Sequence, residues 1–212
     1  KVSYGRVSRW GTIPMASSLD SVGPLGKTAE DCALILHTIA GQDPKDSTTP
    51  DQPVPNYLEE IQKSMSGIKI GIAQEYLAGD GVDPEIVQSL ENTKELLQKM
   101  GADIVNISLP HTKYALAAYY IIAPSEISAN MSRYDGIRFG MGHKEENLEK
   151  IYMSTRESGL GDEVKRRIMI GTYALSAGYY DAFYRKAQKV RTLVKKDFED
   201  NFQKVDAILG PV

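Results

Sequence analysis

The sequence predicts an α/β fold whose sheet is at least partly parallel. Residues 67–73 alternate in side-chain character as a strand does, and residues 102–110 form a second strand-like run. Between them, residues 83–100 place Ile, Val and Leu side chains on one side of a helix. Two strands joined by a helix are usually parallel, so this unit predicts a parallel pair.

Residues before this unit predict one strand and two helices. Residues 3–10 resemble a short strand or ribbon with both of its arginines exposed. A helix is expected over residues 28–40, because Thr28 is a good N-cap and Asp31 completes a near capping box. Residues 57–65 are expected to form a shorter helix after a proline-rich loop.

The second half of the chain predicts a series of helices that ends in a strand. Pro124 is expected to break or kink the first of these helices, because proline cannot donate the helical hydrogen bond, and the alternative is a helix that resumes through Ser128. The helices are expected over residues 114–123, 148–157, 163–176 and 179–201, and the strand over residues 205–209.

Composition excludes several classes of protein. A net charge of −3 argues against a general nucleic-acid binder, which usually carries a basic stripe. One cysteine, Cys32, can form neither an internal disulfide nor a structural zinc site, and it is expected to be a small core residue. No apolar run approaches the roughly 20 residues of a membrane helix, and no signal peptide is visible. The expected location is the cytoplasm, or an organellar matrix in a eukaryote.

The two ends of the sequence are unlike ordinary termini. The chain begins without methionine on a strand-like run, and residues 207–212 are apolar where polar residues are usual. The sequence is therefore expected to be an internal fragment of a longer protein.

The residues alone show no complete catalytic apparatus. The three histidines are scattered, and neither a phosphate-binding loop nor a Gly-x-Ser-x-Gly elbow is present. Asp20, after two serines, is either part of a polar cluster or a turn residue. Arg166 and Arg167 precede a small, tyrosine-rich segment that suits the clamping of a carboxylate. The alternative is a buried helix that starts with two solvated arginines.

Several blocks together carry a family resemblance. Residues 4–11 (Tyr-Gly-Arg-Val-Ser-Arg-Trp-Gly) and 16–24 (Ala-Ser-Ser-Leu-Asp-Ser-Val-Gly-Pro) resemble the amidase signature family. Within that family, residues 43–48, 125–140 and 166–176 are most similar to the glutamine-hydrolysing subunits of tRNA-dependent amidotransferases. The resemblance covers essentially the whole chain. It implies that residues 1–212 are the downstream portion of a single amidase-signature domain, with no second domain. It also implies an α/β fold with a mixed, mostly parallel sheet that has helices on both faces and is incomplete in this chain.

The resemblance also implies which site residues are present. The family uses a Ser–Ser–Lys triad upstream of the Tyr4-Gly5-Arg6 motif, so no catalytic residue is expected in this chain, and the fragment alone is expected to be inactive. Arg167 is expected to clamp the α-carboxylate of glutamine, and Tyr119 to line the same pocket. Arg166 and Tyr120 are the neighbours with which these two residues could be confused. The acidic partner of the substrate amino group is expected beyond residue 212.

The implied activity belongs to the parent enzyme, a carbon–nitrogen ligase that takes its amido group from glutamine. Its A subunit releases ammonia for the B and C subunits of the complex. ATP and Mg²⁺ are used by the partner subunit, tRNA is contacted only through that partner, and neither a cofactor nor a metal is expected in this chain. Two alternatives stay open: a fragment of a stand-alone hydrolase of small amides, and a non-catalytic folded interaction module.

Overall fold

The computed structural model describes residues 1–77 and 81–211, and it divides into two compact units. The first unit combines residues 1–62 with residues 120–184, and the second combines residues 63–119 with residues 185–212. Each unit is therefore built from two separate stretches of the chain. The assignment of residues 1–212 to part of one domain stays a prediction.

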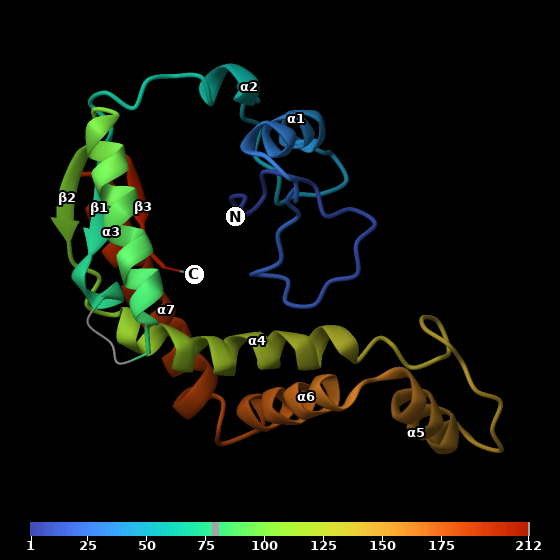
Figure 1. Cartoon of the computed structure of the whole chain (residues 1–212). Helices are drawn as coiled ribbons and strands as arrows, with labels where there is room; N and C mark the ends of the chain where they lie inside the picture. Colours follow the sequence, from blue (N-terminus) through green and yellow to red (C-terminus); the bar gives the residue numbers. More distant parts are fainter. Residues whose placement is uncertain (78–80, 212) are drawn as a thin grey trace. The chain divides into compact units, whose positions relative to one another are not determined.

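The second unit contains a three-stranded sheet of β1 (Lys69–Ala73), β2 (Asp103–Ile107) and β3 (Ala207–Leu209) in the order β2-β1-β3 (Figure 1). Both strand pairs are parallel, which confirms the predicted parallel unit. Helix α3 (Pro84–Lys99) joins β1 to β2, and Asp83 caps it through a 2.8 Å bond from the backbone N–H of Glu85. Proline at the first helical position suits this start, because that N–H has no partner in a helix anyway.

Helices pack on this sheet. Four buried side chains form its core cluster: Ala73, Ile107, Leu109 and Val205. Phe198 of α7 (Lys186–Phe202) packs against the cluster, so α7 lies on the face that carries Ala73. Ile70 and Ile72 alternate to the opposite face and are equally buried. Helix α3 contacts β2 and crosses the sheet in Figure 1.

Helices dominate the first unit. Helix α4 runs from the second unit into the first without interruption. The helices concerned are α1 (Ala29–Ile39), α2 (Tyr57–Glu60), α4 (Ala115–Met131), α5 (Leu148–Gly159) and α6 (Asp162–Leu175). Thr28 and Asp31 form the full capping box at the start of α1, as the sequence predicts.

The predicted strand at residues 3–10 is wrong. Only an isolated antiparallel bridge forms, between Val7 and Ala40. The expectation of exposed arginines is also wrong, because Arg6 and Arg9 are both half-buried. The Nε of Arg6 donates to the Tyr57 hydroxyl at 2.8 Å, for example. These links reach residues far along the chain, so local periodicity does not report them.

Two helix predictions need correction. Pro124 does not break α4, which continues through it to Met131. Pro124 is fully buried, and the Ser125 hydroxyl donates to the carbonyl of Ile121 at 2.7 Å, so packing and side-chain bonding hold the helix together. The last long helix does not start at residue 179, because a π-helical turn, Asp181–Arg185, precedes α7.

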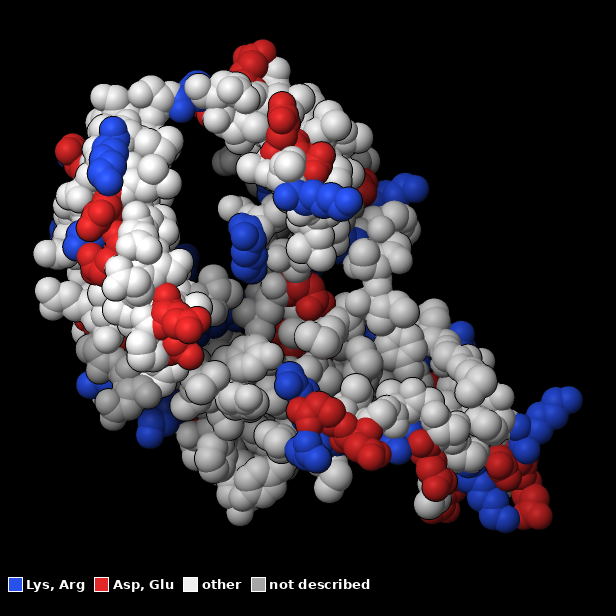
Figure 2. Space-filling model, in the orientation of Figure 1, with Lys and Arg blue, Asp and Glu red and all other residues white. Residues whose placement is uncertain are grey.

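Charged side chains of both signs are visible on the surface (Figure 2). Figure 2 shows basic and acidic side chains interspersed on the face in view, with no broad area of one sign. Across the described ranges, every helix is too short or too polar to cross a membrane.

Candidate functional site

The loop of residues 15–20 is tied to helix α4 within the first unit. Glu126 accepts a hydrogen bond from the backbone N–H of Ser18 at 2.8 Å, and its carboxylate also accepts the Ser18 hydroxyl. One helical turn later, Asn130 donates to the carbonyl of Met15 at 3.1 Å and to the hydroxyl of Ser17 at 3.0 Å. Residues four apart lie on one face of a helix, so α4 presents both side chains to the loop.

The other side of this loop is held by Arg9 and Tyr4. Arg9 Nη1 donates to the carbonyl of Ser17 at 2.6 Å, and the Tyr4 hydroxyl donates to the same oxygen at 2.9 Å. Within the loop, Asp20 accepts the backbone N–H groups of Met15 and Ala16, which makes it a turn residue. Hydrogen bonds therefore hold this loop from both sides and from within.

A close approach seats α6 on α4 (Figure 1). A Cβ atom added at Gly171 would overlap the carbonyl oxygen of Pro124, so only glycine permits this spacing. The hydroxyls of Ser128 and Thr172 lie 2.7 Å apart on the same two helices. Gly171 therefore marks the face of α6 that packs on α4.

This seating distinguishes the two arginines of α6. Arg167 lies four residues before Gly171, and hence on the α4-facing side, whereas Arg166 is turned about 100° away. The exposed fractions of the two side chains agree with this, at 28% for Arg167 and 66% for Arg166. The more enclosed arginine is thus the one that the sequence favours as the carboxylate clamp.

Both arginines share the carboxylate of Glu163. Arg167 Nε donates to it at 2.9 Å, and Arg166 donates to its second oxygen. The hydrogen bond from Arg167, followed by the charges of both arginines, lowers the pKa of Glu163 against an opposing effect of desolvation. Glu163 is more than half exposed, so water screens its pairing with the two arginines.

The structure does not bring the two predicted pocket residues together within one unit. Tyr119 and Tyr120 are neighbours on α4, with exposed fractions of 40% and 51%. Tyr119 belongs to the second unit, whereas Arg167 belongs to the first. The meeting of Tyr119 and Arg167 at one substrate therefore stays a prediction.

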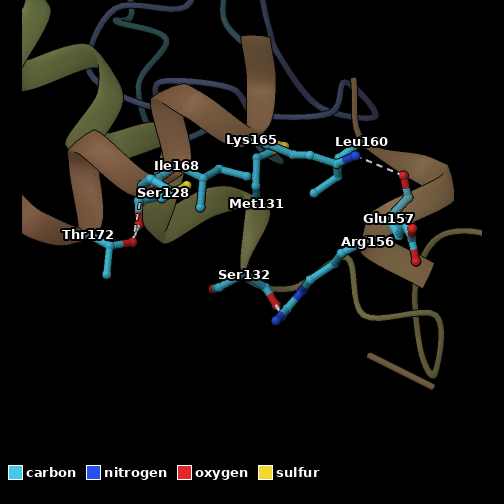
Figure 3. Close-up of a pocket in the computed structure, with 10 residues that line it drawn as sticks. Ser128, Met131, Ser132, Arg156, Glu157, Leu160, Lys165, Ile168 and Thr172 are labelled. Atoms are coloured by element: carbon cyan, nitrogen blue, oxygen red, sulfur yellow. Dashed lines mark hydrogen bonds between the residues drawn. The ribbon is translucent and has the colours of Figure 1, made fainter. Parts of the chain in front are cut away.

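A cavity of about 440 Å³ lies beside α6 in the first unit, between α4, α5 and α6 (Figure 3). Its walls include Met131, Leu160 and Ile168, with Arg156 and Lys165 among its polar residues. Figure 3 shows Lys165 bonded to the carbonyl of Glu157, at 2.9 Å. Neither Arg166 nor Arg167 lines this cavity, so it is separate from the predicted clamp.

Sequence reasoning missed the roles of Glu126 and Asn130. Both lie within residues 125–140, which carry part of the family resemblance, but that resemblance predicts no contact for either side chain. Their four-residue spacing on a helix was an available signal, although their partners lie 108 and 113 residues away in sequence. In the described part of the chain, His, Cys, Asp and Glu side chains form no group of three that could hold a metal ion.

Comparison with known proteins identifies the family. The family model for amidase matches residues 1–212, which is the whole chain. The chain belongs to the amidase family, as its motifs predict, and this is a family of amide-cleaving enzymes.

Individual relatives indicate which kind of amidase-family protein the chain resembles. The chain is 55% identical over all of its 212 residues to the A subunit of glutamyl-tRNA(Gln) amidotransferase from Sulfurihydrogenibium sp., and 56% identical to that from Pseudomonas fluorescens. It resembles the crystal structure of the Thermotoga maritima counterpart with a TM-score of 0.73 and 36% identity over 98% of the chain. The predicted fold class is thereby confirmed. The chain spans 44% of the length of each of the two sequence relatives and 40% of the crystallised protein.

Proposed function

We propose that this chain is part of the glutamine-hydrolysing A subunit of a tRNA-dependent amidotransferase. One observation carries the proposal: over all 212 residues, the chain is 55% identical to a relative that bears this name. Because the chain spans less than half of those relatives, the activity is proposed for the longer enzyme and not for these residues alone.

Arg167 clamps the α-carboxylate of glutamine in this proposal. Its planar guanidinium can give a carboxylate two parallel hydrogen bonds, and its α4-facing position restricts its orientation. Before substrate binds, Glu163 accepts a hydrogen bond from the Nε of this guanidinium. Because Glu163 is exposed, its displacement by the substrate carboxylate costs little free energy. Tyr119 lines the same pocket from α4.

The chemistry itself lies in residues that this chain does not supply. A serine attacks the side-chain amide and releases ammonia, and water then frees glutamate from the acyl-enzyme. The serine nucleophile, the bridging serine and the lysine base of the family all lie upstream of the Tyr4-Gly5-Arg6 motif. The loop of residues 15–20 and its tie to Glu126 would support that region.

The partners are those of the complex. Ammonia passes to the B subunit, which uses ATP and Mg²⁺ to activate the tRNA-bound carboxylate, and the C subunit completes the assembly. This chain needs neither a metal nor a cofactor in the proposal, and the complex works in the cytoplasm.

Replacement of Arg167 by alanine in the intact amidotransferase tests the clamp. We expect the KM for glutamine to rise roughly 10- to 150-fold, because a charge-assisted pair is worth about 1.5–3 kcal/mol. Steady-state ammonia release measures this. Arg166→Ala is the matched control, and it should change KM little, because its side chain lies on the exposed side of α6.

Other outcomes point to the alternatives. An unchanged KM in Arg167→Ala removes this residue from the pocket, and an equal effect of Tyr120→Phe and Tyr119→Phe contradicts the choice of tyrosine. Release of ammonia from small amides without any partner subunit would favour a stand-alone hydrolase. A folded enzyme that neither binds nor cleaves glutamine would favour an interaction module.

A further inference from the structure

A second pocket of about 330 Å³ in the first unit brings three basic side chains together. Arg9, Lys45 and Arg133 line it, and they come from the N-terminal segment, the proline-rich loop and the residues after α4. Like charges that share a small pocket repel one another unless an opposite charge is present. Arg9 forms an ion pair with Asp46, with 3.8 Å between Arg9 Nε and Asp46 Oδ2, so the charges of Lys45 and Arg133 remain to be balanced.

The two carboxylates in the pocket wall are already occupied by other donors. Asp20 accepts backbone N–H groups of the 15–20 loop. Asp46 accepts the backbone N–H of Arg9 at 2.8 Å, the N–H of Thr48 at 3.0 Å and the Thr48 hydroxyl at 2.7 Å. These bonds leave both negative charges in place but hold the two carboxylates at other partners, and among the described residues neither is in ion-pair contact with Lys45 or Arg133.

Donors on the basic side remain available. Arg133 makes one hydrogen bond, 3.3 Å from Nη2 to Asn130, and no carboxylate of residues 1–77 and 81–211 is in ion-pair contact with Arg133 or Lys45. Asp43 is near enough to sense the charge of Lys45, but it accepts the Ser8 hydroxyl at 2.6 Å. Arg9 Nε is buried and faces Asp46 Oδ2 at 3.8 Å, so it is not among the donors offered to a ligand.

Trp10 supplies the apolar wall. It lines the pocket, is 65% exposed, and carries the Lys45 ammonium 5.7 Å from its ring centroid. An exposed indole beside two cations suits a ligand with an anionic group on a planar or apolar body.

We propose that this pocket is a binding site for a small organic anion, held by Lys45 and Arg133 and packed against Trp10. The anionic group is a carboxylate or a phosphoryl group, since both accept the donors that these side chains offer. This site goes beyond the proposed function, because it uses neither Arg167 nor the amide chemistry.

The protein carries its own reporter for this test. Trp10 is the single tryptophan of the chain, so its fluorescence reports on this pocket alone. Inorganic phosphate and acetate are titrated separately at pH 7, with sodium chloride holding the ionic strength constant. We expect a saturable change in emission with a Kd of about 1 mM or lower. If only one of the two anions causes this change, that anion identifies the anionic group that the pocket binds.

Three variants make the result specific. Arg133→Met keeps the Lys45–Trp10 contact, and hence the reporter, and should weaken binding about tenfold or more. Lys45→Met should weaken it similarly when heat of binding is measured in place of fluorescence. Lys144→Met removes a lysine that does not line the pocket, and it should leave the Kd unchanged.

Two results overturn the proposal. One is an emission change that stays linear in the concentration of phosphate and of acetate and is equal to the change that chloride causes. The other is an unchanged Kd in Arg133→Met and Lys45→Met while circular dichroism shows both folded. Arg167→Ala should bind the anion with the parental Kd. The anion Kd therefore tests this pocket, and the KM for glutamine tests the clamp, so either proposal can fail without the other.

Discussion

Asp46 shows how single residues organise the first unit. Hydrogen bonds lower its pKa from 3.8 to about 2. The hydrogen bond from the Thr48 hydroxyl has the largest effect, and those from the backbone N–H groups of Arg9 and Thr48 follow. Desolvation acts in the opposite direction, and the charge of Arg9 adds a smaller effect. The ionised carboxylate thus joins two segments that are far apart in the chain, residues 4–11 and residues 43–48.

We predict that this carboxylate stabilises the fold in a pH-dependent way. Because the folded pKa is depressed, the contribution is complete above about pH 4 and is lost as the pH falls from 3.8 towards 2. Asp46→Asn should lower the melting temperature at pH 7 and flatten its fall across that acid range. Melting curves between pH 2 and 7 measure both. A variant that loses stability in parallel with the parent at every pH would contradict the prediction.

Helix α6 owes its place to its fit against α4. The contact depends on Gly171 at the carbonyl of Pro124. The hydroxyl of the next residue, Thr172, meets that of Ser128, which lies one turn after Pro124 on α4. Helix packing at this distance leaves no room for a methyl group. The face of α6 that carries Arg167 is set by this contact.

We predict that Gly171→Ala is destabilising, although alanine is the better helix former. The added Cβ meets backbone that cannot rotate away, and overpacking of this kind costs about 1–3 kcal/mol. Denaturant unfolding measures the loss. Gly159→Ala is the matched control, because a Cβ there meets nothing within 4 Å, and it should be close to neutral. Equal stability of the two variants would mean that α4 and α6 are not tightly seated.

Apolar surface is the main feature at the scale of the whole molecule. Leu25 is 97% exposed, and it lines a groove of about 680 Å³ in the first unit together with Leu36 and Ile61. Single exposed apolar side chains are ordinary, but a contiguous apolar groove usually meets a partner.

We predict that the 212-residue chain self-associates as its concentration rises. Sedimentation velocity from micromolar to about a hundred micromolar measures this. Leu25→Ser should reduce association without loss of fold, because that side chain is almost wholly exposed. Leu148→Ser, an exposed leucine outside the groove, is the control. A monodisperse monomer of high stability would show the prediction to be wrong.

Elements with local signals were predictable from the sequence. Thr28 with Asp31, and Asp83 with Pro84, mark helix starts within a few residues, and the structure places α1 and α3 there. The parallel pair of β1 and β2 follows from a strand–helix–strand order. Short motifs also predicted the family, because they are contiguous in the chain and need no knowledge of contacts.

Features that depend on distant partners were decided by the tertiary structure. Residues 3–10 form no strand, because Arg6 and Arg9 bond to residues 35 or more positions away. Pro124 stays inside α4 and is buried there, where Gly171 closes on its carbonyl. The partners of Glu126 and Arg133 appear only when the chain is folded.

By itself, then, the sequence determined most of the helices, the parallel pair of β1 and β2 and the family, and the family resemblance singled out Arg167. Only the tertiary structure decided which face of α6 is enclosed, and which charges share a pocket. The reason is physical. Capping and periodicity act over one or two turns, whereas burial and charge neutralisation depend on residues that folding brings together.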